Sequence, residues 1–274
     1  MIPNKTILAF TILICVFFNV NAQNDPITKQ DLPKGRIRLL VEAGFYIKTI
    51  EKKQQAVLRS KIVRTYNVDG KTTQEVIYRD NGSVFDKVNM TYDREGNKTG
   101  IKNLAGTIDG TSKVTGQKNG IKTVRTVFKS GNIVLNKYNI KDQKVEDLVY
   151  DSSKGNASKT TYVYDKNGHE TERNVFSKKD MKLVARLNFY YDAKDRLIRI
   201  ESRNNLGKIL STKAFKYNSN GLKVSMITTN VNPNLVMAEE YKYERMDTKG
   251  NWLKSAVIKN GTVIEVRERE IQYY

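Results

Sequence analysis

Apolar and polar residues alternate along most of the chain, which is the pattern of β-strands with one covered face. Between Leu183 and Tyr191 the odd positions are Leu, Ala, Leu, Phe and Tyr, whereas Arg186 and Asn188 fall on the other face. A period of two with one apolar side predicts antiparallel strands that pack one face and leave the other open. The alternation is imperfect, since Lys213 shares a face with Phe215. We therefore expect many strands to be only half buried.

Short turn sequences separate these segments, and the clearest runs from Tyr92 to Lys98 (Tyr-Asp-Arg-Glu-Gly-Asn-Lys). An Asp at the first position of a type I turn accepts a hydrogen bond from a backbone N–H two residues on. A Gly three residues later adopts a positive φ without steric cost. The sequence therefore predicts strand, tight turn, strand. The turn residues that we single out as structural are Tyr92, Asp93, Gly96, Tyr164, Asp165, Gly168, Tyr217 and Gly221.

The turn recurs at a fixed interval, because Tyr191, Tyr217 and Tyr243 follow one another 26 residues apart. Second turns lie between the copies, so this repeat predicts a strand roughly every 12–14 residues and roughly 15 strands between Tyr66 and Tyr274. Open twisted sheets rarely pass about ten strands without curling or splitting. The predicted fold is all-β: a repetitive antiparallel β-meander of hairpins in a curled or twisted sheet.

Two stretches depart from this pattern. Residues Glu51–Ser60 include good helix formers but no clear cap and no long apolar stripe, so we expect a loop or short turn between two strands. Residues Ile101–Gly120 are rich in turn sequences, and they form either a degenerate repeat or an excursion from the sheet.

The first 22 residues have the composition of a secretory signal peptide. Lys5 supplies the positive charge, an apolar stretch extends from Ile7 to Val20, and Ala22 precedes the expected cleavage point. The stretch is short for a membrane span, which favours removal over anchoring. The predicted organisation is a signal peptide over 1–22, a flexible lead-in over 23–34 and one β-repeat domain over 35–274. Such a protein is exported to the periplasm, the cell surface or the medium.

The chain is strongly basic, with 48 Lys and Arg against 29 Asp and Glu among 274 residues, a formal charge of +19. The basic residues are spread along the chain, and two interpretations stay open. Surface Lys keeps a thin β-protein soluble and its strand edges unpaired. Alternatively, the charge attracts an anionic partner. An anionic glycan or a cell-surface protein is the expected class of partner, and nucleic acid is not expected.

An outer-membrane barrel is the main rival fold, and it needs a continuous apolar outer band. The last segment carries charge on both faces, with Glu265, Arg267 and Arg269 on one face and Glu268 and Glu270 on the other. The sequence therefore argues against a membrane-spanning barrel, and no transmembrane segment is expected in the mature chain.

No catalytic, cofactor-binding or metal-binding motif stands out. The one cysteine, Cys15, lies in the predicted signal peptide, and the one histidine, His169, follows a turn Gly, where a solvent-facing residue is expected. The turn aspartates give one carboxylate per turn, which favours turn capping over calcium binding. The one tryptophan, Trp252, is either a core residue or a platform on which a sugar stacks.

The turn sequence resembles the YD, or Rhs-type, repeat, and the chain from about residue 33 to 274 resembles the small secreted YD-repeat proteins of Bacteroidetes. Besides the signal peptide and the Tyr92–Lys98 turn, the resemblance is carried by Leu32-Pro33-Lys34-Gly35, Lys249-Gly250-Asn251-Trp252-Leu253-Lys254, Asn260-Gly261 and Glu268-Arg269-Glu270-Ile271-Gln272-Tyr273-Tyr274. It implies a spirally curled antiparallel sheet. In the large Rhs and Tc-toxin relatives such repeats build a shell around a cargo. This chain has too few repeats for a closed shell and no appended toxin domain, which argues against a cargo role. Members of the family are often labelled carbohydrate-binding, so the resemblance offers carbohydrate binding as one function to test.

These observations favour an exported, non-enzymatic β-repeat protein that acts by binding or as a scaffold. Its expected partner is a carbohydrate or another cell-surface molecule, and no cofactor is expected. Two alternatives stay open. One is a hydrolase that acts on a surface polysaccharide, since any two acids can meet in space to form a catalytic pair. The other is an accessory or immunity-like component of an Rhs-type system.

Overall fold

The computed structural model describes residues 33–50, 53–94, 96, 98–103, 110–128, 130–151, 153, 155–177, 179–231 and 233–274. The predicted signal peptide and most of the predicted lead-in lie outside these residues. Residues Pro33–Tyr274 form one compact unit. Within it, no helix is long and apolar enough to cross a membrane.

The described part of the chain consists of β-strands joined by turns. Most strands have six to nine residues, and the four longest are the first two, the sixteenth and the last. The strands are β1 (Ile37–Ile50), β2 (Lys53–Tyr66), β3 (Thr72–Tyr78), β4 (Val84–Tyr92), β5 (Lys98–Asn103), β6 (Gly110–Lys118), β7 (Ile121–Phe128), β8 (Ile133–Tyr138), β9 (Lys144–Asp151), β10 (Asn156–Tyr164), β11 (Glu170–Phe176), β12 (Leu183–Tyr191), β13 (Leu197–Asn204), β14 (Ile209–Tyr217), β15 (Lys223–Asn230), β16 (Leu235–Met246), β17 (Trp252–Lys259) and β18 (Thr262–Tyr273).

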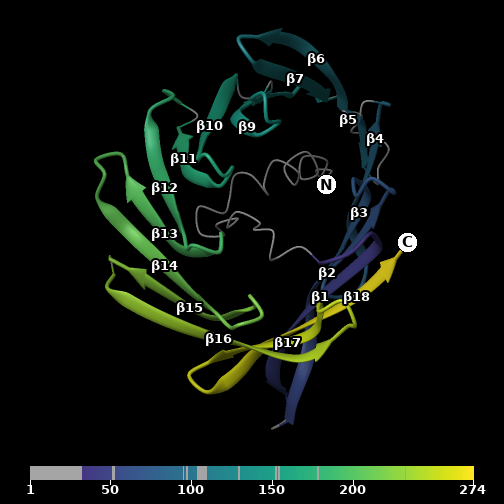
Figure 1. Cartoon of the computed structure of the whole chain (residues 1–274), viewed down its shortest axis with the longest axis vertical. Coiled ribbons are helices and arrows are strands. Elements are labelled where there is room, and N and C mark those ends of the chain that lie inside the picture. Colours follow the sequence, from purple (N-terminus) through teal and green to yellow (C-terminus); the bar gives the residue numbers. More distant parts are fainter. Residues whose placement is uncertain are drawn as a thin grey trace, which may run out of the picture. The chain divides into compact units, whose positions relative to one another are not determined.

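Consecutive strands pair antiparallel, and β1 pairs with both β2 and β18, so the 18-stranded sheet closes on itself. Figure 1 shows the resulting ring of strands, with the last strand beside the first. The prediction of an all-β, curled antiparallel meander of hairpins is confirmed. A barrel with this many strands is too wide for its own side chains to fill.

The two faces of the sheet differ in packing. One face, here called the crowded face, carries the core cluster of Phe189, Leu197, Ile200 and Phe215, and Ile200 is only 1% exposed. The opposite face, here called the open face, carries exposed apolar side chains such as Val236, which is 62% exposed. Side chains converge inside a closed sheet and diverge outside it, so this difference is what closure produces.

The loop predicted for Glu51–Ser60 is wrong. Strand β2 begins at Lys53 and pairs with β1 along its length, with Phe45 opposite Leu58 and Ile47 opposite Ala56. Residues 51 and 52 lie outside the described residues. The pairing explains the error, because a neighbouring strand supplies the backbone partners that the polar sequence alone does not indicate.

Part of the irregular stretch Ile101–Gly120 belongs to the sheet. Strand β6 pairs with β7 over eight residue pairs, but with β5 over only two, Gly100 with Thr111 and Ile101 with Gly110. Residues 104–109 lie outside the described residues. Of the two predicted alternatives, the described parts of the stretch therefore fit a degenerate repeat within the sheet.

Candidate functional site

One end of the barrel is built from repeated turns capped by Asn or Asp. In each, the side-chain Oδ1 accepts hydrogen bonds from the backbone N–H groups two and four residues on. For Asp165 the donors are Asn167 and His169, both at 2.9 Å. The same geometry occurs at Asn67, Asn139, Asp192, Asn218 and Asp247. These bonds fix the turn and leave the cap little capacity for a ligand.

The turn glycines close these loops. Gly96, Gly168 and Gly221 have φ angles of 81°, 90° and 80°, and the N–H of each donates to the carbonyl three residues before it, which in the first turn is that of Asp93. At Gly96 and Gly168 a Cβ would also approach a side chain that crosses from a neighbouring turn. The geometry therefore favours Gly at these positions for conformational and steric reasons.

The regular tyrosines lie on the crowded face and tie each repeat to the one before it. The hydroxyls of Tyr92, Tyr164 and Tyr217 donate to backbone carbonyls 20 residues upstream, at 2.7–2.8 Å. Burial above all, together with nearby negative charge, raises the pKa of Tyr164 to about 12. Since their hydroxyls are occupied and their rings are packed, these tyrosines form no exposed row on which a sugar could stack.

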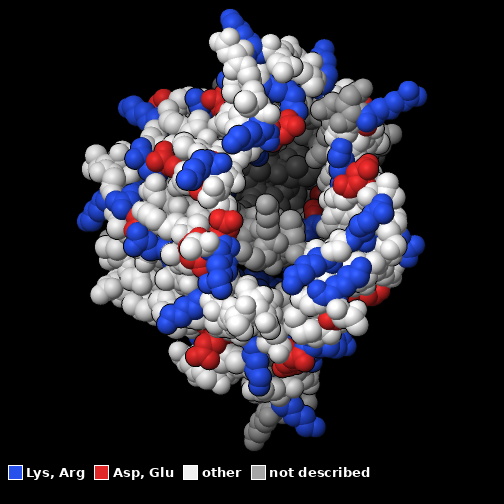
Figure 2. Space-filling model, in the orientation of Figure 1, with Lys and Arg blue, Asp and Glu red and all other residues white. Residues whose placement is uncertain are grey.

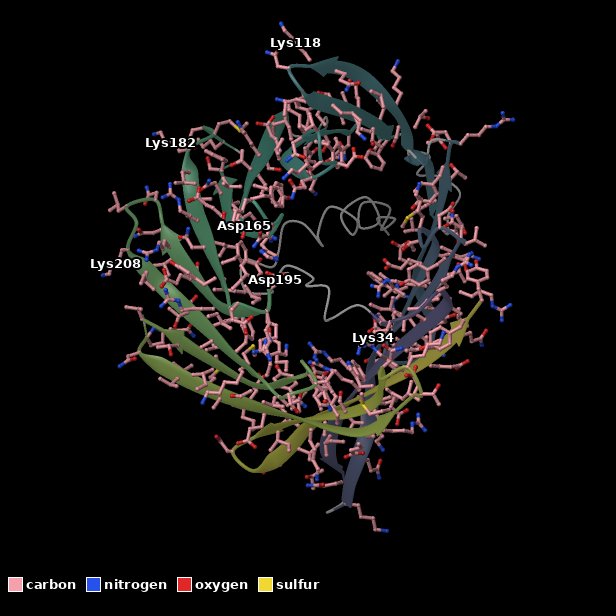
Figure 3. All side chains as sticks on the ribbon, viewed as in Figure 1. Lys34, Lys118, Asp165, Lys182, Asp195 and Lys208 are labelled. Atoms are coloured by element: carbon pink, nitrogen blue, oxygen red, sulfur yellow. The ribbon has the colours of Figure 1, made fainter. Side chains whose placement is uncertain are left out.

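Further links connect neighbouring turns at this end. Lys71 donates to the carbonyl of Gly96 at 2.9 Å. The His169 ring lies between two carboxylates, with Nδ1 3.0 Å from Asp165 and Nε2 3.5 Å from Asp195, and it stacks on Tyr191. In Figure 3, Asp165 and Asp195 lie around the central opening, whereas Lys182 and Lys208 lie at the periphery. His169 is thus half buried in a link between turns and is not the solvent-facing residue expected.

The ring of Trp252 is already in contact with other side chains. The Arg269 guanidinium lies 3.8 Å from its centroid, and the Tyr243 ring is tilted against it at 6.2 Å. A cation over the face of an indole is attracted by its quadrupole. One face of this ring is therefore occupied, and stacking of a ligand on Trp252 stays a prediction.

A groove lies where the first and last strands meet. It has a volume of about 730 Å³, and its lining includes Val41, Ala43 and Phe45 of β1 and Glu268 and Glu270 of β18. The volume is within the range of small-molecule sites. Charges of both signs border the groove, so it selects no single class of ligand by charge.

The open face over β11 to β14 carries a dense cluster of polar side chains, here called the polar patch. Its members are Glu172, Asn174, Arg186, Asn188, Tyr190, Arg199, Glu201, Arg203 and Thr212. Glu172, Asn188, Glu201 and Thr212 are cross-strand neighbours in one row. With neighbouring strands about 4.8 Å apart, this row spans roughly 14 Å. Amide, hydroxyl, carboxylate and guanidinium groups thus lie side by side on one surface.

Glu201 is the centre of the polar patch. It is only 4% exposed, and its carboxylate contacts Arg199 at 3.1 Å, Arg203 at 2.6 Å and the Tyr190 hydroxyl at 3.0 Å. Burial alone would raise the pKa of Glu201, but the hydrogen bonds from Arg203 and Tyr190 and the two positive charges outweigh it and lower the pKa. Glu201 is therefore held ionised, and it fixes the positions of the groups around it.

The rest of the patch is more accessible. The side chain of Arg199 is 48% exposed and lies over the Tyr190 ring, 4.2 Å from its centroid, and that of Arg186 is 42% exposed. Arg186 uses its Nε to donate to Asn174 at 3.0 Å. The sequence pattern already placed Arg186 and Asn188 away from the apolar face. It could not show which side chains of β11 and β13 lie beside them, because bulges shift the register of both neighbouring pairs.

The described part of the chain brings no three His, Cys, Asp or Glu side chains together in a way that could hold a metal ion. Figure 2 shows Lys and Arg spread over the whole visible face, with Asp and Glu interspersed among them. Neither the charge distribution nor a donor cluster therefore singles out another site as clearly as the polar patch.

No protein-family model and no curated protein matches the chain. Among solved structures it is similar to a porin-like protein from Bacteroides uniformis, with 13% identity and a TM-score of 0.51 over 88% of this chain and 99% of the other. A porin-like protein from Bacteroides vulgatus has 13% identity and a TM-score of 0.39, over 69% of this chain and 94% of the other.

The Photorhabdus luminescens Tc holotoxin pore has 9% identity and a TM-score of 0.37, over 82% of this chain and 17% of the toxin chain. At these identities the similarity to the Bacteroides uniformis protein shows a shared fold only, and no conclusion is drawn from the other two similarities. The chain is thus a closed β-structured scaffold, and its relation to YD-repeat proteins stays an interpretation of the sequence.

Proposed function

We propose that this protein is an exported, non-catalytic β-repeat scaffold that binds carbohydrate through the polar patch on β11 to β14. The observation that carries the proposal is the row of Glu172, Asn188, Glu201 and Thr212 across four consecutive strands on the open face. Sugar hydroxyls both donate and accept hydrogen bonds. The half-buried members of this row, Glu172, Asn188 and Thr212, offer carboxylate and hydroxyl acceptors beside amide and hydroxyl donors, and the buried Glu201 holds the groups around it in place. The signal-peptide composition of residues 1–22 supports export to a compartment that holds such ligands.

The same residues argue against the hydrolase alternative. Glu201 is only 4% exposed and its carboxylate is engaged by Arg199, Arg203 and Tyr190, so it has little capacity to act on a glycosidic bond. A glycosidase acid needs a raised pKa, whereas the pKa of Glu201 is lowered. Glu172 is also occupied, since it accepts a hydrogen bond from Asn174 at 2.6 Å. These two carboxylates are better suited to order a binding surface than to cleave a sugar.

The proposal is tested by screening the secreted chain on a glycan array and measuring the best ligands by calorimetry. Asn188→Ala and Thr212→Val each remove one donor of the row, and each should weaken binding roughly tenfold, the size of one lost hydrogen bond in an ordered site. Thr123→Val on β7 is the matched control, because Thr123 lies on the same face outside the patch. Absence of glycan binding, or equal loss in the control, would overturn the proposal. Turnover of a bound glycan would favour the hydrolase.

A further inference from the structure

The polar patch contains an arrangement of charge that a neutral sugar does not require. Arg186 and Arg203 are direct cross-strand partners on the open face of β12 and β13. Like charges directly opposite each other in a sheet are destabilising. Arg199 adds a third guanidinium two residues from Glu201 on the same strand face. Three guanidinium groups thus share the surface with two carboxylates, those of Glu172 and Glu201.

The carboxylates of the patch do not saturate these guanidinium groups. Glu201 is shared between Arg199 and Arg203, and Arg203 also donates to the carbonyl of Gly207 at 2.8 Å. Arg186 is different. Its Nε donates to Asn174 and lies 3.6 Å from Glu172, and its two terminal nitrogens have no partner among the residues that the structure describes.

A guanidinium with two open N–H groups matches the geometry of a carboxylate, which it binds through two parallel hydrogen bonds. The hydrogen bond from Arg186 Nε to Asn174 fixes the guanidinium, so its two terminal nitrogens are held in place before any ligand binds. Asn188 lies two residues along the same strand, on the same face, and provides an amide for a neighbouring hydroxyl. A carboxylate with hydroxyls close by is the chemistry of a uronic acid.

We propose that the polar patch is selective for carboxylated sugars and that Arg186 binds the carboxylate of a uronic acid residue. This inference rests on the proposed carbohydrate-binding function and names its substrate class. The carboxylate also relieves the repulsion between Arg186 and Arg203, which gives the ligand an electrostatic gain that a neutral sugar cannot supply. Hydroxyl contacts from Asn188 and Thr212 are common to charged and neutral sugars.

The test compares trigalacturonic acid with the matched neutral galactose trisaccharide, by calorimetry on the secreted chain at low and moderate salt. We expect the uronate to bind at least tenfold more tightly. Arg186→Ala should reduce uronate affinity about tenfold or more and change neutral binding less than about twofold, the range for a charge-assisted hydrogen-bonded pair. Arg186→Lys should bind the uronate more tightly than Arg186→Ala but less tightly than the native chain. An ammonium keeps the charge but cannot form two parallel hydrogen bonds to a carboxylate.

Arg125→Ala on β7 is the matched control, since it removes the same charge from the open face outside the patch. An equal loss of uronate affinity in Arg125→Ala and Arg186→Ala would show that the overall positive charge attracts the uronate, and it would overturn the proposed role of Arg186. Equal affinity for the two trisaccharides would overturn the selectivity and leave the proposed function standing. Binding of neither trisaccharide, with no other glycan bound on the array, would overturn the proposed function itself.

Discussion

Lys34 and Asn251 are 217 residues apart in sequence and are joined by two hydrogen bonds. The Lys34 N–H donates to Asn251 Oδ1 at 2.6 Å, and Asn251 Nδ2 donates to the Lys34 carbonyl at 3.0 Å. Asn251 also contacts Asp247 and the Tyr273 hydroxyl, which donates to Asp247. The side chain of Asn251 therefore connects the start of the described chain to the turn between β16 and β17, close to the place where the sheet closes.

Removing this side chain should destabilise the closure. Asn251 is 5% exposed, and Asn251→Ala removes the partner of both Lys34 backbone groups and of the Asp247 and Tyr273 side chains. We expect a loss of about 2–4 kcal/mol of unfolding free energy. The measurement is urea unfolding followed by fluorescence. Asn218→Ala is the control, because Asn218 caps its own turn through Asn220 and Leu222, and it should cost about 1 kcal/mol. Equal losses of unfolding free energy in the two variants would show that the contact between Asn251 and Lys34 adds no stability beyond that of an ordinary turn cap.

The tyrosine hydroxyls should contribute measurably to stability. Tyr217 donates to the carbonyl of Leu197, a residue that is itself buried, at 2.7 Å. Tyr217→Phe leaves this carbonyl unsatisfied and should cost about 1–2 kcal/mol. Tyr150→Phe is the control, because Tyr150 is exposed on the open face and should change stability by less than about 0.5 kcal/mol. Thermal unfolding of the two variants measures these changes in stability. An unchanged stability of Tyr217→Phe would contradict the structural role of its hydroxyl.

Turn glycines with positive φ should resist substitution. At Gly168 φ is 90° and an added Cβ would lie 3.0 Å from Gln143 Nε2. Gly168→Ala is expected to cost about 1–2 kcal/mol, the scale of the left-handed penalty for a residue with a Cβ. Gly116→Ala is the comparison, since Gly116 has no positive φ and open space around its Cβ position. It should be neutral or slightly stabilising. A larger loss at Gly116 than at Gly168 in chemical denaturation would refute this.

The repeated turns should make the fold sensitive to acid. Burial acts to raise the pKa of Asp192, but hydrogen bonds from the Arg196 side chain and from backbone N–H groups, together with the Arg196 charge, lower it below its ordinary value. The pKa values of the Asp165 and Asp247 carboxyl groups are lowered by hydrogen bonds in the same way. The unfolded chain then takes up protons first, so this stability is complete above about pH 5 and is lost as the pH falls through about 4 and below.

Asp192→Asn separates the cap from the charge. Asn caps the equivalent turns at positions 67, 139 and 218, so the turn should persist while the acid dependence decreases. Unfolding free energies measured between pH 3 and 7 should show a shallower slope for the variant than for the native chain. An unchanged slope would mean that Asp192 does not contribute to the acid sensitivity.

The sequence by itself determined the local structure of this protein. Alternation fixed which residues of a strand such as Leu183–Tyr191 share a face, and the Asp165 and Gly168 pattern fixed a turn, because both depend on neighbouring residues only. The polar sequence after Glu51 led to the wrong prediction of a loop, because β2 is stabilised by its pairing with β1 and not by its own composition.

The tertiary structure decided closure and the binding surface. Lys34 reaches Asn251, and Glu42 reaches Arg269, only when strands at the two ends of the chain pair. Nothing local encodes that pairing. The polar patch likewise depends on the registers that place Asn188 between Glu172 and Glu201. Single-residue bulges set those registers, and one residue of slip moves every side chain of a strand to the opposite face.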